Sequence, residues 1–200
     1  MNKEQLIQYL KKQSFPEQII KAFEKIKRED FVPENYKEHA YEDAPIPVGY
    51  GATTSQPYTI AFMLNLLELK KDKNQKILEI GSGSGYVLAL LEEITKAKIY
   101  GVEIIKELAE SSQEILKKYK NITIINKSGK NGLPENAPYD RILISAACQD
   151  LETARKLTSQ LKDNGIIVAS VKYSVFKIKK QNGKITTQEF PGFAFVPLQD

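Results

Sequence analysis

The sequence predicts an α/β fold in which a mostly parallel central sheet ends in an antiparallel hairpin and is preceded by N-terminal helices. From Lys76 onward, short apolar strands alternate with helical segments, which is the pattern of parallel strands joined by crossover helices. Two runs of alternating polarity flank Asn182-Gly183, a dipeptide typical of a tight hairpin turn. The chain has 200 residues, 42% hydrophobic and 27% charged, which fits one ordinary globular domain.

The first 40 residues predict two short helices. The first carries an apolar stripe formed by Leu6, Ile7 and Leu10. The second follows Pro16, which is tolerated in the first turn of a helix, and places the apolar side chains of residues 19–26 on one face. These two helices precede the alternating part of the chain.

Residues 31–51 predict a long irregular segment, because three prolines and two glycines interrupt every periodic pattern there. Long ordered loops in compact domains usually have a function, so this segment is a candidate for binding. A helix resumes after Pro57 and directs apolar residues inward as far as Leu67.

The alternating part of the chain predicts a parallel sheet with crossover helices. Its strands are expected at residues 77–80, 98–102, 122–125, 141–145 and 165–171. Its helices are expected at residues 86–93, 106–119 and 151–161. The final antiparallel pair is expected to end near residues 195–198.

Composition argues against several classes of protein. No window approaches about 18 consecutive apolar residues and the start lacks the apolar run of a signal peptide, so we expect a cytoplasmic protein without membrane contact. The single cysteine, Cys148, and the single histidine, His39, cannot form a disulfide or a zinc cage, so we expect no metal. The net charge of +4 is spread over Lys-rich helices, which favours a solvated surface over a nucleic-acid site.

A glycine-rich loop, residues 79–85, reads Glu-Ile-Gly-Ser-Gly-Ser-Gly and follows the first strand of the alternating part. Open parallel sheets bind ligands at such a position, where glycines let the backbone approach closely. A dinucleotide loop needs Gly-x-Gly-x-x-Gly, but the sixth position from Gly81 is Tyr86. Glu103 follows the next strand, where such folds hydrogen-bond ribose hydroxyls. The alternative is a plain glycine turn with a solvated Glu103.

The spacing of this loop, with an acid before it, resembles motif I of the class I S-adenosylmethionine-dependent methyltransferases. Other segments are similar to the protein-L-isoaspartate O-methyltransferase family in the same order, and the similarity spans residues 20–198. These segments are residues 28–34, residues 40–58 with Thr53-Thr54-Ser55-Gln56-Pro57-Tyr58, residues 132–140 and residues 195–198. The resemblance implies a Rossmann-like class I methyltransferase fold.

The resemblance also implies an activity. Members of the family transfer a methyl group from S-adenosylmethionine to the α-carboxylate of L-isoaspartyl residues in damaged proteins and peptides, which starts a repair cycle and leaves S-adenosylhomocysteine. A carboxylate is already ionised at neutral pH, so this reaction needs no general base, which agrees with a single histidine. We expect a monomer without a nucleic-acid partner. Residues 1–200 then form one domain, with residues 1–57 as helices and substrate loop and residues 58–200 as the cofactor-binding core.

Site residues follow from the same resemblance. Cofactor contacts are implied for Glu79, Gly81, Ser82, Gly83, Gly85, Glu103, Ile104, Ser128 and Gly129. Substrate contacts are implied for Thr53, Thr54, Ser55 and Gln56, with Ser55 as the catalytic residue. Ser55 also fits a second interpretation, as the N-cap of the following helix. The family usually has Gly-Asp-Gly where this chain has Lys127-Ser128-Gly129, so an acid is missing there.

Two other functions stay open at this point. One is methylation of tRNA or a small molecule on the same fold, favoured only by the basic charge, because no aromatic clamp for a nucleobase is evident. The other is a binding module that kept recognition of isoaspartate or cofactor and lost turnover, as the missing acid at Ser128 suggests.

Overall fold

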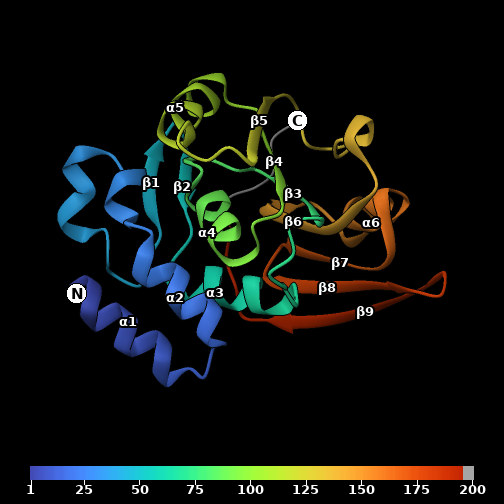
Figure 1. Cartoon of the computed structure of the whole chain (residues 1–200), viewed down its shortest axis with the longest axis horizontal. Coiled ribbons are helices and arrows are strands. Elements are labelled where there is room, and N and C mark those ends of the chain that lie inside the picture. The colour runs from blue at the N-terminus through green and yellow to red at the C-terminus, as the bar shows by residue number, and fades with distance from the viewer. Residues whose placement is uncertain (196–200) are drawn as a thin grey trace.

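The computed structural model describes residues 1–195, in which a seven-stranded sheet has the order β5-β4-β3-β6-β7-β8-β9 (Figure 1). Strands β3 to β7 are parallel to one another, whereas β8 is antiparallel to β7 and β9 is antiparallel to β8. The strands are β3 (Lys76–Ile80), β4 (Lys98–Glu103), β5 (Ile122–Asn126), β6 (Tyr139–Cys148), β7 (Leu161–Val171), β8 (Ser174–Gln181) and β9 (Lys184–Pro191). The expected parallel sheet with a terminal antiparallel hairpin is confirmed.

The direction in which successive strands are added to the sheet changes at β3. This strand comes first in the chain, with β4 on one side and β6 on the other. Ile80, the last residue of β3, is level with Val102 of β4 and Ile144 of β6, so Gly81, Glu103 and Ser145, which follow these positions, lie at the same level of the sheet. This is the switch point at which open α/β sheets bind ligands.

Helices pack against both faces of the sheet, which separates the two larger apolar clusters of the core, while a third, small cluster joins Val32, Ala40 and Ile46. The α-helices are α1 (Lys3–Lys12), α2 (Glu17–Lys25), α3 (Pro57–Leu66), α4 (Tyr86–Thr95), α5 (Lys106–Leu116) and α6 (Leu151–Lys156). Of the two larger clusters, one joins Leu10 and Phe23 of the N-terminal helices to Leu91 of α4, while the other lies between the sheet and Leu157. The first two helices lie on the left in Figure 1 and the β8–β9 hairpin projects to the right. No helix within residues 1–195 combines the length and apolarity needed to cross a bilayer.

The expectation of an irregular segment over residues 31–51 is wrong in part. Two 3-10 helices, η1 (Arg28–Phe31) and η2 (Glu34–His39), lead into an antiparallel pair formed by β1 (Ile46–Gly49) and β2 (Ala52–Thr54). The alternation that makes β1 a strand is short and contains a proline: Ile46 and Val48 are buried, while Pro47 faces outward. The substrate loop is therefore an ordered hairpin.

Later boundaries also differ from the expected ones. Helix α6 ends at Lys156 and a 3-10 turn, η4 (Leu157–Gln160), leads directly into β7, which begins four residues earlier than expected. The hairpin turn at Asn182-Gly183 is confirmed, with φ of 51° and 73°. Strand β9 ends at Pro191, so the antiparallel pair stops short of its expected end, and Val196, Pro197 and Leu198 lie outside the described residues.

Candidate active site

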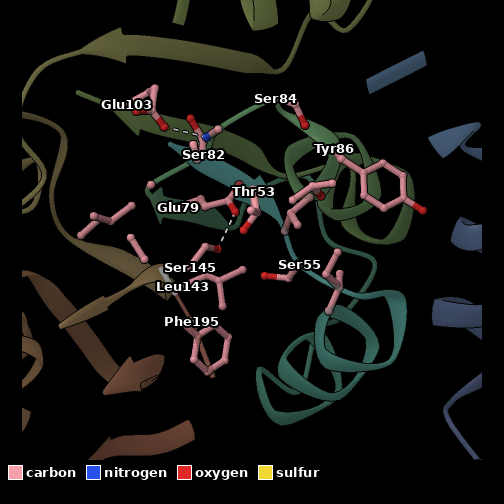
Figure 2. Close-up of a pocket in the computed structure, with 18 of the residues that line it drawn as sticks. Thr53, Ser55, Glu79, Ser82, Ser84, Tyr86, Glu103, Leu143, Ser145 and Phe195 are labelled. Carbon is pink, nitrogen blue, oxygen red and sulfur yellow. Dashed lines mark hydrogen bonds between the residues drawn. The ribbon is translucent and has the colours of Figure 1, made fainter. Parts of the chain in front are cut away.

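A cavity of about 490 Å³ opens at the switch point of the sheet. One wall consists of the loop between β3 and α4 together with the ends of β4 and β6. The other wall consists of β2, the start of α3 and the C-terminal segment at Phe195. Figure 2 shows side chains from both walls directed into the same space, among them Glu79, Thr53 and Ser55.

The three glycines of the loop differ in what surrounds the position that a Cβ atom would take. All have positive φ (76° at Gly81, 51° at Gly83 and 83° at Gly85), which favours glycine. A Cβ at Gly81 would lie 2.8 Å from Cβ of Ala146, and one at Gly85 would lie 2.6 Å from Cδ1 of Leu116. A Cβ at Gly83 would meet nothing within 4 Å. Gly81 and Gly85 thus permit close packing, whereas Gly83 leaves space open beside the cavity.

Glu103 fixes the glycine loop to the end of β4. Its buried carboxylate accepts one hydrogen bond from the backbone N–H of Gly83 (2.7 Å) and another from that of Ile105 (3.0 Å). A carboxylate has about four acceptor positions, so this one can still accept from a ligand that carries neighbouring hydroxyls.

Glu79 is a second buried carboxylate in the cavity wall. Its Oε1 accepts from Oγ of Ser145 at 2.7 Å (Figure 2), while its Oε2 and the hydroxyl of Ser82 are buried with no partner in the described residues. The pKa of Glu79 is raised to about 8, mainly by burial and to a smaller extent by the charge of Glu103, against the lowering effect of the Ser145 hydrogen bond. These unpaired polar atoms call for a ligand that donates hydrogen bonds or carries positive charge.

The hydroxyl of Ser55 has no hydrogen-bond partner within residues 1–195, so it is available to a ligand in the cavity. The N-cap of α3 is Gln56, and the capping hydrogen bond comes from Asp43, whose Oδ1 accepts from the backbone N–H of Tyr58 at 2.7 Å. The interpretation of Ser55 as a helix cap is therefore wrong. Its side chain points into the cavity (Figure 2), and its carbonyl oxygen accepts from Nη2 of Arg28 at 3.0 Å.

Most residues expected at the site line this one cavity. They are Thr53, Thr54, Ser55, Gln56, Glu79, Gly81, Ser82, Gly83, Glu103, Ile104 and Gly129. Of the described residues assigned to the cofactor, Gly85 and Ser128 are the two outside the lining: Gly85 packs against α5, and the hydroxyl of Ser128 accepts from the backbone N–H of Lys130.

Sequence reasoning missed several lining residues, of which Ser145 and Phe195 matter most. Ser145 comes from β6, directly after the stretch that pairs with β3, so a signal existed in the polar residue that follows an apolar strand. Phe195 lies at the cavity because Phe193, two residues earlier in the chain, stacks on Phe62 of α3 with 5.1 Å between the ring centroids, and no short motif predicts that contact.

The charge of the lining restricts the ligand. Two carboxylates face the cavity, whereas no lysine, arginine or histidine of residues 1–195 lines it. A pyrophosphate would find no cation there, but a positively charged ligand with a vicinal diol would find two acceptors. S-adenosylmethionine is such a ligand, so the residues present fit it.

Comparison with known proteins agrees with this geometry. The chain matches the family model Protein-L-isoaspartate(D-aspartate) O-methyltransferase (PCMT) over residues 1–200. The protein-L-isoaspartate O-methyltransferase of Dictyoglomus turgidum is 39% identical over 202 residues, which cover 97% of this chain and 89% of that protein. A solved protein-L-isoaspartate O-methyltransferase has a TM-score of 0.88 at 25% identity, over 100% of this chain and 66% of the other.

A Plasmodium falciparum structure assigned to the same family, solved in complex with S-adenosyl-L-homocysteine, shares the fold with a TM-score of 0.84 at 23% identity, over 100% of this chain and 99% of that one. The fold and the site thus define a class I S-adenosylmethionine-dependent methyltransferase. The match over the whole chain is more specific: the chain belongs to the protein-L-isoaspartate(D-aspartate) O-methyltransferase family. The fold class, cofactor and enzyme class expected from the sequence are confirmed.

Proposed function

We propose that this protein methylates the α-carboxylate of L-isoaspartyl residues in damaged proteins and peptides. The observation that carries the proposal is one cavity in which two buried carboxylates face the hydroxyl-rich hairpin that bears Ser55. The backbone nitrogen of the following residue can then attack the carbonyl carbon of the methyl ester and displace methanol, which leaves more readily than water leaves a free carboxylate. The succinimide that forms is hydrolysed in part to normal aspartate. The enzyme thereby begins a repair cycle.

The glycine-loop wall is assigned to the cofactor. When bound, S-adenosylmethionine supplies a methyl group on a positively charged sulfur, which an ionised carboxylate can accept directly. Glu103 would hold the ribose hydroxyls, and the backbone at Gly81 and Gly83 would lie against the cofactor. Glu79 would offer its unpaired oxygen to the cationic end of the ligand.

The hairpin wall is assigned to the substrate. Ser55, with the hydroxyls of Thr53 and Thr54 and the amide of Gln56, provides donors that can orient an anionic carboxylate. No proton has to be removed from that carboxylate, so the chain needs donors and not a base. Met63, Leu143 and Phe195 supply apolar surface that excludes water, which strengthens each polar contact in the site.

The remaining assignments concern the setting in which the enzyme works. We propose a monomer that acts in the cytoplasm on proteins and peptides, without a nucleic-acid or membrane partner. One free cysteine, buried at the end of β6, is consistent with a reducing compartment. The chain is assigned as a single domain because the N-terminal helices share an apolar cluster with α4, residues 1–57 contributing the substrate hairpin and residues 58–200 the cofactor core.

The test is transfer of tritiated methyl groups to an isoaspartyl peptide and to its twin with normal aspartate. We expect base-labile label in the isoaspartyl peptide alone. Label in both peptides would remove the substrate assignment, and label in added tRNA but in neither peptide would favour the alternative methyltransferase. Calorimetry completes the test, because a binding module that lost turnover would bind S-adenosylmethionine without transferring label.

A further inference from the structure

Arg28 is the largest side chain that is fully buried, and it lies outside the cavity lining. It begins the 3-10 helix η1, and its guanidinium makes four hydrogen bonds, all to backbone carbonyl oxygens. Nη1 donates to Ala40 (2.8 Å) and Glu42 (3.1 Å), and Nη2 donates to Ala44 (3.1 Å) and Ser55 (3.0 Å). An ion that has left water needs such partners, but carbonyls are an uncommon choice where a carboxylate would serve.

Two of the four carbonyls belong to the two ends of the substrate hairpin. Ala44 precedes β1 by two residues and Ser55 follows β2 directly, so a single nitrogen of Arg28 joins the two ends. Ala40 and Glu42 belong to the segment that leads into the hairpin. The contacts made by Arg28 therefore close the hairpin at its base, where the backbone of Ser55 emerges.

A second contact restrains the same segment. Asp43 lies between the carbonyls that Arg28 holds, and its carboxylate caps α3 through the N–H of Tyr58. Ser55 is thus held on one side by Arg28 and on the other by a helix whose start is tied to the same loop. Both restraints act on the backbone, which leaves the hydroxyl of Ser55 available.

We infer that Arg28 is a positioning residue, which fixes the backbone of Ser55 through its carbonyl so that the hydroxyl is held where the substrate carboxylate binds. This inference rests on the proposed function of Ser55. The planar guanidinium suits the task because its two terminal nitrogens hold all four carbonyl oxygens at once in a rigid fork, whereas a lysine ammonium has one nitrogen with three donors and cannot satisfy all four. Burial lowers the pKa of Arg28. The ordinary pKa of an arginine is so far above neutral pH that the guanidinium nevertheless stays charged.

Arg141 provides a matched control. It is also buried, and it also donates to backbone carbonyls, those of Leu67 (2.5 Å), Asp140 (2.7 Å), Glu68 (3.3 Å) and Asn164 (3.5 Å). It lies near the start of β6, whereas Ser145 lies near the other end of that strand, and it does not line the cavity. Replacing either arginine by lysine keeps the charge and loses a fork of hydrogen bonds, but only one of the forks holds Ser55.

The experiment compares Arg28→Lys and Arg28→Ala with Arg141→Lys. Each folded variant is measured for its melting temperature, its Kd for S-adenosylmethionine and its kcat with an isoaspartyl peptide. We expect Arg28→Lys to lower kcat by about tenfold to a hundredfold, the loss expected when a reacting geometry shifts by a fraction of an ångström to an ångström, with Kd for the cofactor within about twofold of wild type. Arg141→Lys should lower the melting temperature and leave kcat near the wild-type value.

Chemical rescue gives a readout that a merely structural role would not produce. Guanidinium ion at non-denaturing, millimolar concentration should restore part of the kcat of Arg28→Ala, whereas the same concentration of urea should not. Wild-type kcat in Arg28→Lys, or equal losses of kcat in the Arg28 and Arg141 lysine variants, would overturn the inference. So would failure of both Arg28 variants to fold while Arg141→Lys folds. A wild-type protein without activity on the isoaspartyl peptide would instead count against the proposed function.

Discussion

The two walls of the cavity are built in different ways. The cofactor wall depends on residues 79–85 and on Glu103, which binds the loop through the N–H of Gly83. The substrate wall depends on Ser55, whose backbone is held by a side chain 27 residues earlier in the chain. One wall is thus a local turn with a carboxylate support, and the other is assembled from separate parts of the N-terminal region.

This difference suggests how the two halves of the reaction are divided. A turn specified by its own glycines can bind the cofactor whatever the state of the hairpin. A hairpin held from behind can be altered without changing the cofactor site. The walls should therefore respond separately to substitution: changes in the first should affect binding of S-adenosylmethionine, and changes in the second should affect turnover.

The largest separation is expected from Gly83→Val. A side chain there would project into open space beside the cavity at a φ of 51°, so it should abolish binding of S-adenosylmethionine while the fold persists. Calorimetry measures the binding and circular dichroism the fold. Gly183→Val is the matched control, because Gly183 also has a positive φ and nothing within 4 Å of its Cβ position, but lies in the β8–β9 turn. Retained binding in Gly83→Val would contradict the cofactor assignment.

On the other wall, Ser55→Ala should lower kcat by about a hundredfold, which corresponds to roughly 3 kcal/mol for a hydrogen bond lost from a transition state in a site that excludes water. The Kd for S-adenosylmethionine should hardly change, because the cofactor wall is intact. Steady-state kinetics with an isoaspartyl peptide gives the first value and calorimetry the second. Ser159→Ala, at an exposed position in η4, should leave both unchanged. An unaltered kcat in Ser55→Ala would remove Ser55 from the chemistry.

A smaller effect is expected from the pH dependence of Glu79. With a pKa of about 8, this group is mostly protonated in the free protein at about pH 6.5. A cation bound beside it favours the ionised form, so binding of S-adenosylmethionine should release up to one proton, and affinity should rise with pH toward 8. Calorimetry in buffers of different ionisation enthalpy counts that proton, and Glu79→Gln should release none. The same release from the variant would place the proton elsewhere.

Glu79 also has a consequence for stability without cofactor. Because its pKa in the folded protein is raised, its favourable contribution is present below the ordinary value of 4.5 and is lost as pH rises through about 8. The free energy of unfolding of the free protein should therefore decline over that range more steeply than that of Glu79→Gln. Urea denaturation at several pH values measures the difference, and parallel curves for the two proteins would contradict the burial of an uncompensated acid.

The smallest effect is expected from His39→Gln. His39 is half exposed at the end of η2, where its Nδ1 is 2.8 Å from Oε1 of Glu42, and it does not line the cavity. Activity should rise through the acid range as the substrate carboxylate ionises and then stay flat, in the variant as in the wild type. A limb near about pH 6.5 that disappears in the variant would show that a histidine titrates in the reaction.

The glycine-loop wall could be predicted from the sequence because its chemistry lies in consecutive residues. Spacing alone did not show which glycine faces the ligand: Gly85 has the motif position, but its missing side chain makes room for Leu116 of α5. Ser145 belongs to the site only because of the strand order: β6 pairs directly with β3, although β4 and β5 lie between them in the sequence. Sequence motifs therefore predict local turns well, but they predict poorly which strands are neighbours in the sheet.

The hairpin wall was less predictable for a physical reason. Prolines and glycines conceal the two-residue alternation of Ile46 and Val48, so the segment reads as irregular although burial makes it a strand. The role of Arg28 cannot be predicted from a sequence motif, because its partners are backbone carbonyl oxygens, which every residue has. A buried cation with carbonyl partners can be found only once the chain is folded.

The most direct test of two separate walls is hydrogen–deuterium exchange of the wild-type protein with each ligand added in turn. S-adenosylhomocysteine should slow exchange in peptides that cover residues 79–86 and 103–106. Addition of an isoaspartyl peptide should then slow exchange over residues 44–56, and its aspartate twin should not. Protection of residues 44–56 by the cofactor product alone, or protection by the isoaspartyl peptide on a surface away from both walls, would contradict the account.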